Sequence, residues 1–141
     1  MKLTSKGRYA VIAMLHIALK QSAGLTTLAM ISDSQEISLS YLEQIFAKLK
    51  KAGLVISIRG PGGGYRLSRL ATEISIKSIV IAVDEKIDPK KCSGKKNCKK
   101  EGACLSHHLW EELSNNIERF LANMSLQDVI DRKSTHSIVT F

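Results

Sequence analysis

Three cysteines and one histidine with metal-binding side chains lie close together in the second half of the chain. Their spacing is Cys92-x5-Cys98-x5-Cys104-x2-His107, and the chain has no other cysteine. Three thiols and an imidazole make up a complete four-ligand set for a metal centre. The lysines beside and between the cysteines favour thiolate, the form of cysteine that binds metal. The pattern therefore predicts a metal site.

The spacing also bears on which metal is bound. Structural zinc sites usually use pairs of cysteines separated by about two to four residues, and the five-residue intervals here are long for that geometry. Irregular loops with glycine, such as CSGKKNC and CKKEGAC, suit an iron-sulfur cluster, which spreads its ligands over more than one iron. The pattern favours a cluster over zinc. A reactive-thiol switch is also compatible with it, whereas a chance grouping is disfavoured.

Composition and charge describe the protein that carries this segment. The chain has 141 residues and 44% hydrophobic content, which is typical of one globular domain with an appended element. Residues 1–70 hold ten Lys or Arg and only three Asp or Glu. This imbalance suggests a polyanionic partner, although a basic solvated surface has the same composition.

The apolar N-terminal run raises the question of a signal peptide or membrane span. His16 and Lys20 interrupt this run, and no convincing cleavage site follows it. An odd number of cysteines also does not suit a fully paired secreted disulfide framework. We expect no membrane association and a cytoplasmic location.

The N-terminal half predicts a helix-turn-helix. Residues 5–20 are apolar nearly all round, which indicates a helix buried on several sides. Thr26 or Thr27 can cap a short second helix, and SDSQEIS then breaks the pattern. A third helix is predicted over residues 38–51, ended by Gly53. Its expected buried side consists of Leu39, Leu42, Ile45, Phe46 and Leu49.

The opposite face of the third helix has the chemistry to read DNA. The second helix of a helix-turn-helix, which is the third helix of this chain, enters the major groove of DNA. The predicted base-reading residues are Ser40, Glu43, Gln44 and Ala47. The Gln44 amide has the geometry to hydrogen-bond adenine. The Glu43 carboxylate must either accept a hydrogen bond from cytosine or be repelled by phosphate and base acceptors. Phosphate contacts are expected from Lys48, Lys50 and Lys51. The alternative is a plain exposed face with Ser40 and Glu43 as a capping box.

The stretch GLVISIRGPGGGYRLS predicts a β-hairpin, which makes the motif a winged helix. The predicted wing residues that contact the DNA backbone or minor groove are Arg59, Gly60, Gly62, Gly63, Tyr65 and Arg66. Glycine brings no side chain to block close approach. A dinucleotide-binding loop is rejected, because Tyr65 stands where the third glycine is needed and no helix follows.

The rest of the chain predicts a linking helix over residues 71–85 capped near Ser75, the cysteine loop at 86–104, and helices over 105–132. Residues 133–141 are predicted to be a disordered tail. Apolar residues recur every three or four positions from Leu105 to Met124. This apolar stripe could pack on its own domain, but pairing with the same helix of a second chain is favoured, because DNA-binding proteins of this class commonly act as dimers. The predicted dimer interface is Leu109, Leu113, Ile117, Phe120 and Leu121. The fold class is mainly α with a small hairpin wing.

Four features together resemble a known family. They are LTSKGRYAV, ISLSYLEQIFAKLKKAGLV, RGPGGGY and the cysteine-histidine spacing. Over residues 1–130 the chain resembles the iron-sulfur cluster regulators. These belong to a family of winged-helix transcription factors that sense iron-sulfur clusters or nitric oxide. The ligand spacing is the specific part, since relatives that sense nitric oxide space their cysteines differently.

This resemblance implies a homodimeric repressor and activator that binds a palindromic operator in double-stranded DNA and controls cluster-assembly genes. It implies a [2Fe-2S] cluster on Cys92, Cys98, Cys104 and His107, supplied by cluster-assembly proteins. Carried over by position, the ligand is His107 and not His108. The alternatives are zinc or [4Fe-4S] as cofactor, a thiol- or zinc-switched repressor, and a nitric-oxide sensor. No enzyme is expected, because no serine elbow, phosphate loop or metalloprotease helix is apparent.

Overall fold

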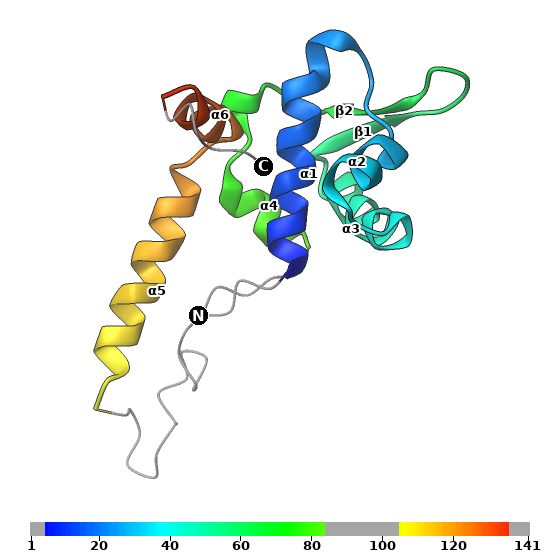
Figure 1. Ribbon diagram of the computed structural model, residues 1–141. Coiled ribbons are helices and arrows are strands. Elements are labelled where there is room, and N and C mark those ends of the chain that lie inside the picture. The colour runs from blue at the N-terminus through cyan, green and yellow to red at the C-terminus, as the bar shows by residue number, and fades with distance from the viewer. Residues whose placement is uncertain (1–4, 84–104, 136–141) are drawn as a thin grey trace.

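The computed structural model describes residues 5–83 and 105–135 (Figure 1). Its helices are α1 (Ser5–Lys20), α2 (Leu28–Gln35), α3 (Leu39–Lys51), α4 (Ile76–Ala82), α5 (His107–Ala122) and α6 (Leu126–Thr135). Strands β1 (Val55–Ile58) and β2 (Gly64–Leu67) form an antiparallel hairpin. Short 3-10 turns occupy Gln21–Ala23 and Ala71–Glu73. The predicted fold class, mainly α with a small hairpin, is confirmed.

Helix α1 is the centre of the body. Ala10, Ala13, Met14 and Ile17 are fully or almost fully buried on it. It contacts α3 and β2 as well as α4 and α6, and Figure 1 shows it passing between these two groups of elements. The prediction of a helix buried on several sides is confirmed. All these elements share one core.

Helix α2 begins at the predicted cap and ends within the predicted stretch. The side-chain oxygen of its N-cap, Thr27, accepts a hydrogen bond from the Met30 N–H at 3.2 Å. The predicted break within SDSQEIS is confirmed, but it comes only in the second half of that stretch, because the helix continues to Gln35. Asp33 and Ser34 are exposed, so their polar side chains remain in water without interrupting the helix. The turn starts at Glu36, which has a left-handed φ of 55°.

Helix α3 is closed at both ends by local hydrogen bonds. Ser38 is its N-cap and accepts from the Tyr41 N–H at 3.2 Å. After its last turn the Gly53 N–H donates to the Lys50 carbonyl and the Leu54 N–H to the Leu49 carbonyl, each at 3.0 Å. This double closure needs a left-handed residue, and Gly53 has φ of 77°. The predicted helix end is confirmed.

One residue of the expected buried side of α3 is exposed. Leu42, Ile45, Phe46 and Leu49 are buried as predicted, but Leu39 is 44% exposed. Leu39 is the first residue of the helix. Helical spacing alone cannot distinguish these two positions.

The hairpin is tied to the body at its base. Val55 pairs with Leu67 and Ile58 with Gly64, and Val55 and Leu67 are buried. The backbone of Thr26, just before α2, joins β2 through two hydrogen bonds with Tyr65, of 3.1 and 2.7 Å. This third segment fixes the direction of the wing.

Helix α5 stands out from the body and is joined to it at its C-terminal end (Figure 1). There the Ile76 N–H donates to the Met124 carbonyl at 2.8 Å, and the Leu126 N–H donates to the Ile74 carbonyl at 3.0 Å. Helix α6 follows and packs against α1. The long helix starts at His107, so Leu105 lies in a turn and is 97% exposed. Helix α6 reaches Thr135, three residues into the predicted tail.

Candidate DNA-binding surface and metal ligand

One face of α3 carries the four predicted base-reading residues. Ser40, Glu43, Gln44 and Ala47 are all exposed, opposite the side chains that enter the core. The alternative of a capping box formed by Ser40 and Glu43 is wrong, because Ser38 is the N-cap and Glu43 is the fifth residue of the helix. Neither side chain is needed to start α3. Both are therefore available to a ligand of this face.

The predicted phosphate-binding lysines cluster at the C-terminal end of α3. Lys50 and Lys51 are exposed and Lys48 is half-buried. Cations in the last turn also stabilise a helix through its macrodipole. The three lysines thus have a local role in the folded chain in addition to their expected contact with phosphate.

The wing presents two cations on either side of a tight turn. Arg59 and Arg66 are exposed, and the Gly63 N–H donates to the Gly60 carbonyl at 2.9 Å. A Cβ on Gly60 or Gly62 would meet nothing within 4 Å, whereas one on Gly63 would lie 2.8 Å from the Gly60 oxygen and closer still to the Ile58 oxygen. Gly63 is thus required by the hairpin itself, irrespective of any approach to DNA.

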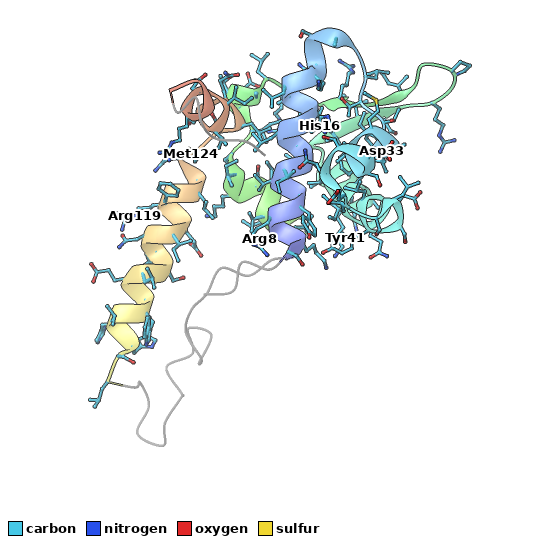
Figure 2. All side chains as sticks on the ribbon, in the orientation of Figure 1. Arg8, His16, Asp33, Tyr41, Arg119 and Met124 are labelled. Atoms are coloured by element: carbon cyan, nitrogen blue, oxygen red, sulfur yellow. The ribbon has the colours of Figure 1, made fainter. Side chains whose placement is uncertain are left out.

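Two aromatic contacts that the sequence analysis missed hold this surface together. Tyr65 of β2 packs edge-on against Phe46 of α3, with ring centroids 4.8 Å apart. Tyr9 of α1 packs perpendicular to Tyr41 in the first turn of α3, with centroids 5.8 Å apart. Figure 2 shows Tyr41 at the same end of the body as Arg8 of α1. Such contacts join residues far apart in the chain, so no local pattern signals them.

Of the four predicted metal ligands, the structure describes one. His107 is 0% exposed at the start of α5, and its Nε2 lies 3.6 Å from Glu111 Oε2. The adjacent His108 is exposed. Cys92, Cys98 and Cys104 lie outside the described residues. Within residues 5–83 and 105–135 no three His, Cys, Asp or Glu side chains are grouped to hold a metal.

The predicted dimer residues divide into two sets. Leu109, Leu113 and Phe120 are 58%, 38% and 54% exposed, and Ile117 is half-buried. Leu121 is half-buried and packs against the core of its own chain, and its place in an interface stays a prediction. Only His107 and Ser114 are buried on α5. Exposed apolar side chains along one helix mark a candidate surface for a partner, and the interface stays a prediction.

A helix-turn-helix, a hairpin wing packed on its second helix and a polar exposed face on that helix together define a winged-helix DNA-binding protein. Residues 3–132 match the family Rrf2, described as an iron-dependent transcriptional regulator, and the chain belongs to this family. It is a DNA-binding transcriptional regulator and not an enzyme. No helix in the described part of the chain is long and apolar enough to cross a membrane.

Named relatives and solved structures agree with this assignment. The chain is 54% identical over 134 residues to a putative HTH-type transcriptional regulator of Haemophilus influenzae, covering 95% of this chain and 89% of that one. It is 56% identical to the regulator IscR of Vibrio vulnificus, and the match covers 92% of this chain and 77% of that one. The structure matches T. potens IscR with a TM-score of 0.79 at 30% identity, covering 100% and 94%. CymR, the global cysteine regulator of B. subtilis, matches with a TM-score of 0.81 at 30% sequence identity. The match covers 94% of this chain and 98% of that one.

Proposed function

We propose that the chain is a cytoplasmic, homodimeric regulator that senses iron-sulfur cluster status and controls genes of cluster assembly. The proposed cofactor is a [2Fe-2S] cluster held by Cys92, Cys98, Cys104 and His107. The relatives named IscR support this reading, as does the description of the family as iron-dependent. The fold alone does not choose the signal, because a cysteine regulator matches it as well as T. potens IscR does.

The observation that carries the proposal is the position of His107. Its imidazole is buried and lies beside the Glu111 carboxylate, and carboxylates often orient metal-binding histidines in this way. A surface histidine would show the exposure of His108 instead. Three thiolates and an imidazole suit an iron-sulfur centre. These residues therefore fit the group, which would supply a signal that depends on redox state and iron.

The connections of α5 offer a route from this site to DNA. His107 begins the helix. Just past its other end, Met124 and Leu126 are hydrogen-bonded to Ile76 and Ile74, at and just before the start of α4. Both α4 and α6 pack on α1, which also contacts α3. A change in the position of α5 is thus passed to the body that holds the recognition helix. Cluster occupancy would bias the equilibrium between two arrangements with different DNA preference.

The DNA partner is proposed to be a palindromic operator. Two winged helices related by a two-fold axis bind two half-sites. The exposed faces of α3 and the wing would enter the DNA grooves, with Arg59 and Arg66 near the backbone. Cluster-assembly proteins are the proposed source of the cluster.

The test is a visible absorption spectrum with iron, sulfide and zinc analysis of protein purified without oxygen. We expect broad charge-transfer bands with about equal iron and acid-labile sulfide. Cys92→Ala and His107→Ala should lose or shift these bands, while His108→Ala, the matched control, should retain them. A colourless protein with stoichiometric zinc, also after reconstitution with iron and sulfide, would contradict cluster sensing and favour a zinc-switched repressor.

A further inference from the structure

An open cavity lies between α4 and α5, where the long helix leaves the body (Figure 1). Its volume is about 400 Å³, within the range of about 300–1,000 Å³ that is typical of small-molecule sites. Lys77 lines it from α4, and Asn115, Glu118, Arg119 and Ala122 line it from α5. All of these side chains except that of Ala122 are polar, so the cavity suits a small polar ligand.

This cavity is separate from the sites already described. Among the described residues, its lining includes neither His107 nor any residue predicted for DNA contact or for the dimer interface. Its residues on α5 belong to the second half of that helix, whereas His107 is the first residue. A molecule bound here would therefore be distinct from the metal, the DNA and the second chain of the proposed function.

Two opposite charges line the cavity from different helices and are not used by the fold. Lys77 is half-buried and Glu118 is exposed. In the part of the chain that the structure describes, neither side chain has an ion pair or a hydrogen bond, with the other or with a third residue. A half-buried ammonium has lost part of its hydration, and without a counter-ion that loss is not offset. A carboxylate supplied by a ligand would offset it.

The two charges together select the chemistry of the ligand. A simple anion would pair with Lys77 but be repelled by Glu118, and a simple cation would meet the reverse problem. A molecule that carries an ammonium and a carboxylate close together satisfies both residues at once. The amide of Asn115 can both donate and accept, so it can support either group. Arg119 adds a second positive charge, although its guanidinium already donates to the Asn115 carbonyl and to Asn116 Oδ1.

We propose that the cavity between α4 and α5 binds a free α-amino acid, with its carboxylate on Lys77 and its ammonium on Glu118. The ligand joins two helices that are otherwise tied just beside it, where the Ile76 N–H donates to the Met124 carbonyl at 2.8 Å. It thereby fixes the position of α5 on the body. The inference goes beyond the proposed function and does not depend on the identity of the metal.

Isothermal titration calorimetry of the full chain with each of the common L-amino acids in turn tests the ligand class. We expect at least one of them to bind with one site per chain. The N-acetyl and the carboxamide derivatives of that amino acid each lose one charge, so each should bind about tenfold more weakly. An N-acetyl or carboxamide derivative that binds as well as the parent would overturn the two-charge site, and so would the absence of binding by every amino acid.

Variants of the two charged residues test the location. Lys77→Met and Glu118→Gln remove the charge and keep a side chain of similar size, and each should raise the Kd of the amino acid about tenfold. Lys20→Met is the control, because Lys20 is exposed on α1 and does not line the cavity, and it should retain the native Kd. Circular dichroism confirms that the helices of each variant are intact. A native Kd in either Lys77→Met or Glu118→Gln would overturn the proposal.

Discussion

The ring of Tyr65 meets the ring of Phe46 edge-on, with centroids 4.8 Å apart and planes at 64°. Phe46 is fully buried in α3 and Tyr65 is half-buried in β2. The same Tyr65 pairs through its backbone with Thr26, which lies just before α2. One residue of the wing therefore links all three parts of the DNA-binding unit. The wing is thereby packed directly on the recognition helix.

Tyr65→Ala should destabilise this unit. Loss of a half-buried ring and its aromatic contact is expected to lower the free energy of unfolding by about 2 kcal/mol, measured by urea titration. Tyr65→Phe keeps the ring and should retain stability. If Tyr65→Phe also retains full DNA affinity, the hydroxyl makes no DNA contact and the predicted wing role of Tyr65 is only structural.

Two serines of similar exposure have different expected roles at the start of α3. Ser38 caps the helix, so Ser38→Ala should cost about 1 kcal/mol of stability. Ser40→Ala should leave the unfolding free energy nearly unchanged but weaken specific DNA binding by about 1 kcal/mol. Thermal unfolding and fluorescence anisotropy at one fixed salt concentration separate the two effects. A large stability loss in Ser40→Ala would contradict this assignment.

Glu43→Ala should relax sequence discrimination. A carboxylate on the groove face accepts from cytosine and is repelled by base acceptors and phosphate, so its removal should narrow the affinity differences between related sites. The measurement is competitive binding to variants of a DNA site selected from a randomised pool. Gln44→Ala is the comparison and should instead weaken binding by about 1–3 kcal/mol at its preferred base. Unchanged selectivity in Glu43→Ala would remove Glu43 from the reading face.

Gly63→Ala should disrupt the wing tip. The added methyl group would overlap the backbone oxygens of Ile58 and Gly60, and overpacking of this kind costs about 1–3 kcal/mol. Gly62→Asn is the control, because its site is open and asparagine tolerates the left-handed φ of 74°. Urea titration should show a loss for the first variant and little change for the second. Equal stability of both would contradict the tight packing at Gly63.

His16 should make the stability of the fold depend on pH. Burial of the imidazole, and then the charge of Lys20, lower its pKa from the ordinary value of 6.5, and its Nδ1 atom is buried without a hydrogen bond in the described structure. The folded chain therefore takes up a proton less readily than the unfolded chain. Stability is retained above pH 6.5 and decreases as the pH falls from there toward the lowered pKa. Urea titrations at several pH values should show a smaller decrease in His16→Gln.

Local chemistry in the sequence was sufficient to predict most element boundaries. Thr27, Ser75 and Gly53 occupy their expected capping positions, because caps depend on hydrogen bonds within a few residues. The hairpin around GPGGG follows from the same short-range rules. The family resemblance also came from the sequence, through the cysteine-histidine spacing and the recognition helix.

Exposure and long-range contacts were decided only by the tertiary structure. Periodicity placed Leu39 with the core, yet Leu39 is exposed, and it gave no sign that Leu121 packs against the core of its own chain. It also could not show that His107 is buried while His108 is exposed. Burial depends on which surfaces meet, and those surfaces come from segments as distant as Thr26 and Tyr65 or Ser75 and Ser125. A linear pattern defines the faces of a helix, but only the packing of the whole chain determines which faces are covered.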